Sequence, residues 1–402
     1  MPDAEFLPAL RHVDIVPLQD AGDEPRFALV DRSGFSPHTL ALSPAGYFIL
    51  AHLDGRHSVE RIQDVFLREL GVRIEAEPIR ELVEALDANL MLETPRFEAA
   101  YAERLAAYRA AGVRDNRARY PDGGALRGQL RTLLESGSAD GLTDVSGLVA
   151  PHLDYERGGP AYADAYATLA RTPWADRFVI LGTNHFGRGQ GTVATTADFE
   201  TPLGRVETDA DFIAGLESDL GASLRAFELD HVGEHSIELQ VHMLQVLAGG
   251  RPMRIVPLLC PYPCGPTGTV PPDGHGPDLR HVAEALARRI AADGSRRTVL
   301  IAGADLSHVG KHFGDAHPRT PESLRAIEHA DRLLLELVAR SELERFLDVI
   351  RGASNATRVC SAGCLFALRH ALRGRPARLL RYHQATNHEA DMHVTCAALA
   401  IL

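Results

Sequence analysis

The chain has 402 residues, enough for about two or three domains of ordinary size, and its hydrophobic fraction of 45% can fill substantial cores. Its 42 Lys and Arg residues against 54 Asp and Glu residues give a formal charge of -12, which opposes attraction to phosphate backbones and anionic membranes. Nucleic acid and membrane surfaces are therefore not expected as partners.

The sequence shows no signal for export. Its first residues, MPDAEFLPAL, lack a basic start and a continuous apolar run, and no stretch approaches about eighteen uninterrupted apolar residues. The 5 cysteines are an odd number in a long chain, which favours reduced thiols over a disulfide framework. We expect a cytoplasmic protein without structural disulfides.

Residues 1–94 are predicted to form a small helical domain, with a strand-like FALV segment near residue 27. Ser43 can cap a helix whose first position is Pro44, and Asp54-Gly55 marks the following turn. Two apolar series then repeat at helical spacing, Ile62, Val65, Phe66 and Leu70, and Ile79, Leu82, Val83 and Leu86. Residues 95–115, rich in Ala, Arg and Glu, are predicted to be a connecting helix.

The order of helix, DG turn, two helices and a final LMLE strand resembles the PqqD-type winged-helix module, which binds leader peptides of ribosomally made natural products. This resemblance implies that a peptide adds as a strand to the edge of the module. The alternative is an ordinary helical packing module that docks on the main domain.

Residues 116–402 are predicted to form an α/β domain, a mixed and mostly parallel sheet flanked by helices, because buried strands alternate with helical patterns from Gly147 onward. The predicted strands are residues 147–150, 178–182, 254–259, 298–303, 378–382 and 394–402. The predicted helices are residues 161–170, 235–248, 279–293, 322–340 and 361–372. A segment rich in Pro and Gly, residues 261–278, is predicted to be a surface loop.

Polar side chains follow several of these strands. His152 follows GLVAP, His185 follows FVILGTN, Asp305 and His308 follow TVLIAGA, and a run from Gln384 follows RLLRY. Ligands of open α/β sheets bind outside the carboxyl ends of the strands, so these side chains are predicted to face one region.

A single His after a strand is more often a hydrogen-bonded structural residue than a ligand, but the repetition over separate strands favours a site. Imidazoles presented from rigid strands suit Fe(II), Zn(II) or Cu(II), with positions left open for water or substrate. The spacing alone does not select the metal.

Six segments occur in the order found in the Memo family, which the chain resembles over residues 116–402. They are APHLDYERGGPAYADAY, FVILGTNHFG, FETPLGRVETD, GEHSIELQVHML, IAGADLSHVGKHF and YHQATN. The Memo family is also known as component B of the AmmeMemoRadiSam system, and its fold is similar to that of class III extradiol dioxygenases. The resemblance implies this fold, and the name of the system implies a radical-SAM enzyme as a partner, but similarity of fold does not establish shared catalysis.

The resemblance implies that His152 and His185 are metal ligands. Many animal relatives have a Cys as the third ligand, and aligning the C-terminal motif places His388 at that position, with His383 as the substitute if the alignment slips. A neutral imidazole in place of a thiolate favours iron or zinc over Cu(I).

Asp305 and His308 match the family's D-x-x-H segment, which faces the same cavity. His308 is the expected general acid and base, because His titrates near neutral pH. Asp305 is expected to orient His308 or a ligand imidazole. The alternative is a structural Asp that caps the following turn.

The remaining site residues are expected to form the pocket wall or to support the ligands. His235, Glu238 and His242 would share one face of a helix, with His242 as a surface or packing residue. These supporting residues are Asp154, Tyr155, Glu234, His235, Glu238 and Gln384.

Two cysteine pairs have the spacing C-x3-C, Cys260 with Cys264 and Cys360 with Cys364. A four-thiolate zinc site more often has two or four residues between its cysteines, so we interpret these side chains as small hydrophobic residues.

These observations favour a mononuclear metal oxidoreductase, with Fe(II) as the expected cofactor, that acts on a small molecule or peptide. The alternatives are a non-catalytic protein that binds a peptide partner and keeps a metal pocket, and a copper-binding or redox-buffering protein.

Overall fold

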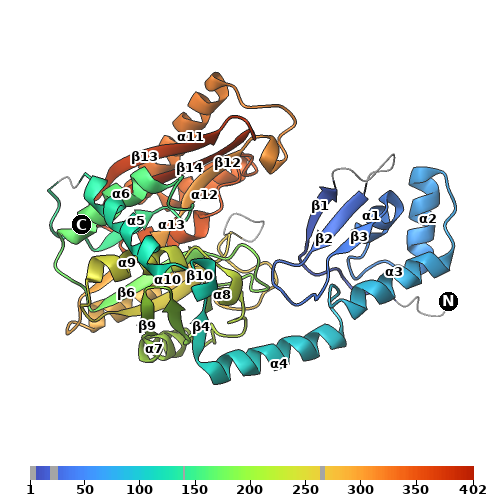
Figure 1. Cartoon of the computed structure of the whole chain (residues 1–402), viewed down its shortest axis with the longest axis horizontal. Coiled ribbons are helices and arrows are strands. Elements are labelled where there is room, and N and C mark those ends of the chain that lie inside the picture. The colour runs from blue at the N-terminus through green and yellow to red at the C-terminus, as the bar shows by residue number, and fades with distance from the viewer. Residues whose placement is uncertain (1–5, 19–25, 139–140, 263–267) are drawn as a thin grey trace. The chain divides into compact units, whose positions relative to one another are not determined.

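A computed structural model describes residues 6–18, 26–138, 141–262 and 268–402 of the chain (Figure 1). The chain divides into two compact units, Met1–Ala110 and Ala111–Leu402. We call them the N-terminal unit and the C-terminal unit and describe each by itself.

The N-terminal unit combines an antiparallel sheet of strand order β1-β2-β3 with helices. Ser43 and Ser58 cap the first two helices, and each side chain accepts a hydrogen bond from a backbone N–H of the first turn. The elements are β1 (Asp14–Leu18), β2 (Arg26–Val30), β3 (Leu40–Leu42), α1 (Pro44–Leu50), α2 (Val59–Leu70) and α3 (Ala76–Ala88). The predicted FALV strand and helices are confirmed. The predicted LMLE strand is reduced to one isolated bridge, between Leu10 and Leu92, and the PqqD-like character of the unit stays a prediction.

Helix α4 (Pro95–Ala111), predicted as a linker, packs within the N-terminal unit. Phe97 is fully buried, and the guanidinium carbon of Arg11 lies 3.8 Å from the centre of its ring. Arg104 donates a hydrogen bond to the backbone carbonyl of Ser33 at 3.1 Å. The boundary between the units therefore falls inside the predicted linker, and β4 (Val113–Asp115) belongs to the C-terminal unit.

In its described residues, the C-terminal unit is built on a mixed sheet of 11 strands with the main order β12-β14-β5-β11-β6-β10-β9-β8-β4. Strands β5, β11, β6 and β10 are parallel neighbours in its centre, and β14 pairs antiparallel with β5. Beyond the main order, β13 pairs with β14 and β7 pairs with β10. The strands are β5 (Gly147–Ala150), β6 (Arg177–Thr183), β7 (Val193–Ala194), β8 (Asp198–Thr201), β9 (Gly204–Thr208), β10 (Arg254–Cys260), β11 (Thr298–Gly303), β12 (Asp305–Val309), β13 (Ala377–Asn387) and β14 (Met392–Ile401).

Helices cover both faces of this sheet because the central strands are apolar on both sides. Along β6, Val179 and Leu181 pack into one core cluster, whereas Phe178 and Ile180 pack into the other. Helices α5 (Gly123–Ser136), α6 (Gly159–Ala170) and α9 (Glu238–Ala248) enclose one cluster. Helices α7 (Ala210–Leu220), α10 (Leu279–Ala292), α11 (Pro321–Ala339), α12 (Leu343–Gly352) and α13 (Ala362–Ala371) enclose the other.

The mixed and mostly parallel α/β fold predicted for this unit is confirmed, and each predicted strand falls on β5, β6, β10, β11, β13 or β14. Two predictions differ from the structure near the site. Residues 305–309 form strand β12, which was not among the predicted strands, and the helix predicted from residue 235 begins at Glu238. Residues 263–267 of the predicted surface loop lie outside the described residues. Within the described chain, we find no helix with the length and apolar character needed to cross a bilayer.

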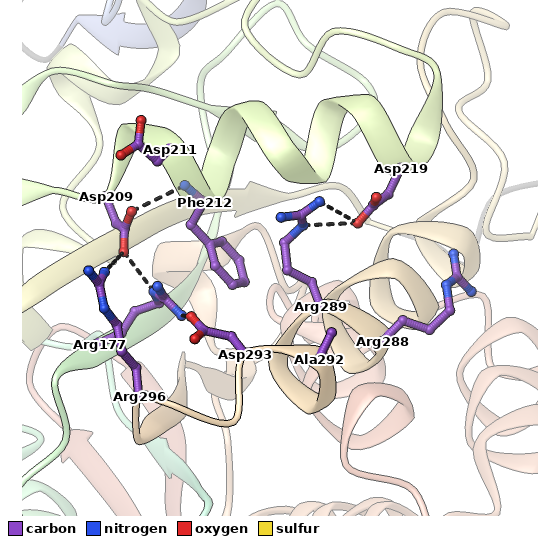
Figure 2. Close-up of a pocket in the computed structure, with 10 residues that line it drawn as sticks. All are labelled: Arg177, Asp209, Asp211, Phe212, Asp219, Arg288, Arg289, Ala292, Asp293 and Arg296. Carbon is purple, nitrogen blue, oxygen red and sulfur yellow. Dashed lines mark hydrogen bonds and ion pairs between the residues drawn. The ribbon is translucent and has the colours of Figure 1, made fainter.

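The amino end of β6 carries a buried ion-pair network (Figure 2). Arg177, the first residue of the strand, is 3% exposed and donates to Asp209 at 2.7 Å and to Asp293 at 2.8 Å. Its guanidinium carbon lies 4.4 Å from the centre of the Phe212 ring. At a rise of about 3.3 Å per residue, Arg177 lies roughly 20 Å from the other end of the strand.

Candidate metal centre

Three imidazoles converge at the carboxyl ends of the central strands. His152 follows β5, His185 follows β6, and His235 lies between α8 (Asp230–Gly233) and α9. Their ligand nitrogens all lie within 4.8 Å of one another. The ring centres are 4.9 Å apart for His152 and His185, 5.5 Å for His152 and His235, and 5.2 Å for His185 and His235. The three rings are therefore close enough to bind one ion.

Hydrogen bonds select which nitrogen of two of these rings faces the shared space. Nδ1 of His152 lies 2.9 Å from the carbonyl oxygen of Gly303, and Nδ1 of His185 lies 3.0 Å from the carboxylate of Glu234. A carbonyl oxygen and a carboxylate can only accept hydrogen bonds, so Nδ1 carries the proton in each ring. In the neutral tautomers, Nε2 is left with a lone pair for a metal.

Glu234 organises two of the three histidines. Its buried carboxylate accepts hydrogen bonds from the backbone N–H groups of His185, His235 and Ser236 at 3.0, 2.8 and 2.9 Å. Burial opposes its charge, but His185, His235 and the hydrogen bond from Ser236 together outweigh burial and hold the pKa of Glu234 well below its usual range. The carboxylate is therefore a fixed anion that orients the imidazole of His185. Burial lowers the pKa of His235 to about 4, which keeps that ring neutral.

Cys360 adds a thiol beside the histidines. Its sulfur lies 3.5 Å from Nε2 of His152. Burial raises the pKa of the Cys360 thiol, but the neighbouring His152 and His308 lower it by more than burial raises it. The pKa of this thiol is therefore well below its usual value. In turn, the carboxylate of Asp305 and the Cys360 sulfur overcome burial and raise the pKa of His152 to about 9. The interpretation of Cys360 as a packing residue is therefore wrong, because its thiol lies beside the histidine cluster and its pKa is lowered there.

Asp305 and His308 lie where the sequence predicted them, beside the same space. The carboxylate of Asp305 accepts from the backbone N–H of His152 at 3.1 Å, and its other oxygen lies 3.5 Å from Nε2 of that ring. Nδ1 of His308 lies 3.1 Å from the Leu306 carbonyl and 3.2 Å from the Arg358 carbonyl, so this nitrogen also carries a proton. Asp305 thus contacts a candidate ligand imidazole, whereas in the described chain we find no hydrogen bond between Asp305 and His308.

A cavity of about 410 Å³ opens over these groups. Asp154 lines it and is held by Arg157, whose Nε lies 2.6 Å from the carboxylate. The other lining residues include His152, His185, His235, Asp305, His308, Tyr120, His312, Phe313 and Met392. The site therefore has a volume in which a substrate of modest size fits beside His308.

Several expected site residues lie elsewhere. His388 is exposed in the turn between β13 and β14, where its ring packs 5.4 Å from that of His393. His383 contacts the carbonyl of Arg157 at 2.9 Å. Gln384 donates to the carbonyl of Leu324 at 3.1 Å. The prediction of His388 as third imidazole is therefore wrong, as is the substitute His383. Neither residue belongs to the group of three imidazoles, whose third member is His235.

Tyr155, Glu238 and His242 lie behind the cavity rather than on its wall. The Tyr155 hydroxyl donates to the carbonyl of Leu239 at 2.8 Å and lies 3.2 Å from Nδ1 of His242. Glu238 is fully buried and pairs with Arg114 at 2.7 Å. The expectation that His235 shares a helical face with Glu238 and His242 is wrong, because α9 begins only at Glu238 and leaves His235 free to turn toward the other histidines.

The remaining cysteines give no support to a four-thiolate site. Cys260 and Cys364 are buried in the core cluster that includes α13. Cys264 lies outside the described residues.

The donor atoms fit a single transition-metal ion. Imidazole nitrogens and a thiolate sulfur are ligands of Fe(II), Zn(II) and copper. Metal-binding histidines commonly donate their second N–H to a carboxylate or a carbonyl, as His185 and His152 do here. Sequence reasoning found two of these groups but missed His235 and Cys360 as direct participants.

Comparisons with known proteins agree with the order of the sequence motifs. The Memo-like protein family model matches residues 118–401. A MEMO1 family protein of Aquifex aeolicus is 24% identical over 357 residues, which cover 88% of this chain and 87% of the relative. A MEMO1 family protein of Thermus thermophilus is 27% identical, and the match covers 82% of this chain and 94% of the relative. One from Methanopyrus kandleri is 34% identical, and the match covers 50% of this chain and 66% of the relative.

An uncharacterized protein of Escherichia coli K12 with a known crystal structure aligns with a TM-score of 0.37 and 15% identity, over 64% of this chain and 100% of that chain. This likeness is too distant to carry an argument, and the likeness to extradiol dioxygenases stays a prediction. The family match includes every residue of the histidine cluster together with Cys360, Asp305 and His308. The chain therefore belongs to the Memo-like protein family.

Proposed function

We propose that this protein is a mononuclear metal-dependent oxidoreductase that acts on a small molecule or peptide in the cavity beside His308. The observation that carries the proposal is the convergence of His152, His185 and His235, whose ligand nitrogens lie within 4.8 Å of one another. An Fe(II) ion, the first metal candidate, would supply electron-transfer chemistry and open coordination positions for a substrate.

In this proposal, His308 moves a proton. Its Nδ1–H donates to the carbonyl oxygens of Leu306 and Arg358, which holds the ring in one orientation. Nε2 is therefore the nitrogen that can accept a proton from a substrate and return it. Asp305 acts at His152, where its carboxylate accepts a hydrogen bond from the backbone N–H of that residue. The two residues therefore have separate tasks, proton transfer and ligand orientation.

The experiment is anaerobic reconstitution of the purified full chain with Fe(II), Zn(II) or copper, followed by metal analysis and electron paramagnetic resonance. We expect one ion per chain in the wild type and loss of most of it in His185→Ala, because that variant removes a ligand nitrogen. His308→Ala is the matched control and keeps its metal. A wild type that binds none of these metals, or equal metal content in His185→Ala, would contradict the proposal.

Copper binding without turnover is a second candidate function, and Cys360 is the observation that favours it. The expectation of iron rested partly on an imidazole replacing a thiolate, but the sulfur of Cys360 lies 3.5 Å from Nε2 of His152. A thiolate is a soft ligand that selects Cu(I). Tight Cu(I) binding by a protein that reconstitutes poorly with Fe(II) would favour this candidate over the first.

Peptide binding by the N-terminal unit is a third candidate, supported by strand β1. In the described chain, β1 pairs only with β2, and its residues Ile15, Val16 and Leu18 are 38%, 41% and 41% exposed. Such an edge can accept a further strand.

The test is the variant Val16→Lys, which would place a charge on this edge strand. Peptides that co-purify with the wild type and are lost from Val16→Lys would support this function, and identical recovery from both proteins would oppose it.

A further inference from the structure

Arg114 is a buried arginine on the short edge strand β4, upstream of residue 118, where the match to the family model begins. It is 2% exposed, and β4 pairs with β8 so that Arg114 lies opposite Phe199. The guanidinium carbon lies 4.9 Å from the centre of the Phe199 ring. The side chain is therefore anchored at its base by the sheet and along its length by an aromatic ring.

The guanidinium holds the chain segment that precedes α9. Nε donates to the carbonyl of His231 at 2.5 Å, and Nη2 donates to the carbonyl of Glu234 at 2.5 Å. Nη2 also lies 2.7 Å from the carboxylate of Glu238. One rigid planar group thus fixes both ends of the segment 231–234 and the first residue of α9, which a flexible ammonium group does not reproduce.

The fixed segment carries the groups that orient two candidate ligands. The backbone carbonyl of Glu234 is held by Arg114, and the side chain of the same residue contacts Nδ1 of His185 at 3.0 Å. His235 is the next residue in the chain and a member of the imidazole cluster. A shift at Glu234 would therefore move His235 directly and release His185 from its carboxylate.

We propose that Arg114 is a positioning residue of the metal centre, which acts through Glu234 and His235. This inference rests on the proposed metal function. If Arg114 has this role, a residue between α4 and residue 118, where the family match begins, helps to hold the candidate metal ligands in position. Arg114 itself touches none of the three imidazoles.

Arg177 provides a matched control for the loss of a buried arginine. It is 3% exposed, pairs with carboxylates and lies over an aromatic ring, as Arg114 does, but it is at the amino end of β6 (Figure 2). Its partners, Asp209 and Asp293, are not part of the imidazole cluster. A general loss of stability should therefore appear in both arginine variants, whereas a positional effect should appear only at Arg114.

The test compares Arg114→Met, Arg114→Lys and Arg177→Met in the full chain, each with and without His235→Ala. Affinity for Co(II) is measured by competition with a chelator, and the visible spectrum of the Co(II) protein reports its coordination. We expect Arg114→Met to lose roughly ten- to a hundredfold in affinity and to change the spectrum, with Arg177→Met within about twofold of the wild type. In the His235→Ala background, Arg114→Met should cost less affinity than in the wild type, because only its effect on His185 through Glu234 remains. Arg114→Lys keeps the charge beside Glu238 and serves if the Met variant does not fold.

Hydrogen exchange of the metal-free proteins provides a readout that does not depend on metal binding. We expect faster exchange of backbone amides in residues 234–236 for the Arg114 variants and no change there for Arg177→Met. Equal affinity losses in the two arginine variants, or an undiminished loss in the His235→Ala background, would overturn the inference. If the wild type binds no metal, the proposed function fails, whereas unchanged exchange in residues 234–236 would overturn the role of Arg114.

Discussion

Cys360 is the single residue that most affects which metal the site should prefer. Its sulfur lies 3.5 Å from Nε2 of His152, in a group that otherwise offers imidazole nitrogens. Cys360→Ser replaces a soft donor by a hard one of similar size. We expect Cu(I) affinity to fall by roughly tenfold or more while Zn(II) affinity falls less, measured by competition titration under anaerobic conditions. Equal losses for the two metals would place the thiol outside the coordination sphere.

His231 makes the stability of the C-terminal unit depend on pH. It is 1% exposed, and burial, with the nearby Arg114 cation, lowers its pKa to about 3. Between pH 6.5 and 3 the unfolded chain therefore binds a proton that the folded chain does not, so stability falls as the pH falls through this window. The contribution is about 1.4 kcal/mol per pH unit.

The variant His231→Gln removes this titration and keeps an N–H donor for the Val193 carbonyl, which His231 contacts at 3.1 Å. We expect the wild type to lose roughly 2 kcal/mol more unfolding free energy than His231→Gln between pH 6.5 and 5, measured by urea unfolding at each pH. Parallel losses in the two proteins would show that His231 is protonated in the folded state.

At the scale of single residues, the sequence predicted the members of the site that follow predicted strands. His152 and His185 each lie two residues after the end of a strand, β5 and β6, so the parallel arrangement of these strands places them at the same edge of the sheet. His235 and Cys360 precede helices instead, and their positions depend on where α9 and α13 begin. Helix starts are poorly defined by apolar periodicity, which explains why His235 was placed on a helix and Cys360 in the core.

At the scale of elements, the site depends on how closely the segment before α9 approaches the strand ends. Gly182 is the penultimate residue of β6, and a Cβ there would lie 2.5 Å from Cγ1 of Ile237 and 2.6 Å from the hydroxyl of Ser236. A Cβ at Gly303 of β11 would lie 2.5 Å from the carbonyl oxygen of Ser236. These glycines therefore let the chain carrying His235 lie against the sheet.

We expect Gly182→Ala to destabilise the protein by about 1–3 kcal/mol through overpacking and to weaken metal binding, because Ser236 and Ile237 must move. The control is Gly128→Ala in α5, where a Cβ meets no atom within 4 Å. That change should raise stability by about 0.5–1 kcal/mol, since alanine favours the helix. Thermal unfolding and metal titration of both variants check the contrast, and intact metal affinity in Gly182→Ala would show that the segment has room to shift.

The predicted elements were most accurate where apolar runs are long and buried. Strands β5 and β11 match their predicted bounds because both consist of continuous apolar residues with a polar boundary. Strand β12 was missed because its sequence, DLSHV, is neither a continuous apolar run nor a regular alternation, although almost all of its residues are buried. Ser307 and Asp305 are buried there by specific hydrogen bonds to Asp331 and to the backbone of His152, which a single sequence does not reveal.

At the scale of the whole molecule, the two units have separate cores. Leu29, Ile62 and Leu86 belong to the core cluster of the N-terminal unit, whereas Val179 and Phe178 belong to the two clusters that flank the large sheet. In the sequence this division was visible as a change of pattern from Gly147 onward, and the family resemblance placed the start of the second domain at residue 116. The boundary between Ala110 and Ala111 was not predicted, because α4 continues the helical pattern through the predicted linker. Separate cores are the physical condition for separate unfolding transitions.

We therefore expect calorimetry of the full chain to show two transitions, of which metal shifts only one. The imidazole cluster lies within the C-terminal unit, so a bound ion stabilises that unit alone. At a free metal concentration 1,000 times the Kd, the stabilisation is about 4 kcal/mol, which raises the midpoint of that transition by roughly 10 °C. His185→Ala should abolish the shift and leave the other transition where it is. A metal that raised the midpoints of both transitions together would contradict this expectation. The two units would then unfold as one cooperative body, and the stability of the N-terminal core would depend on more than its own residues.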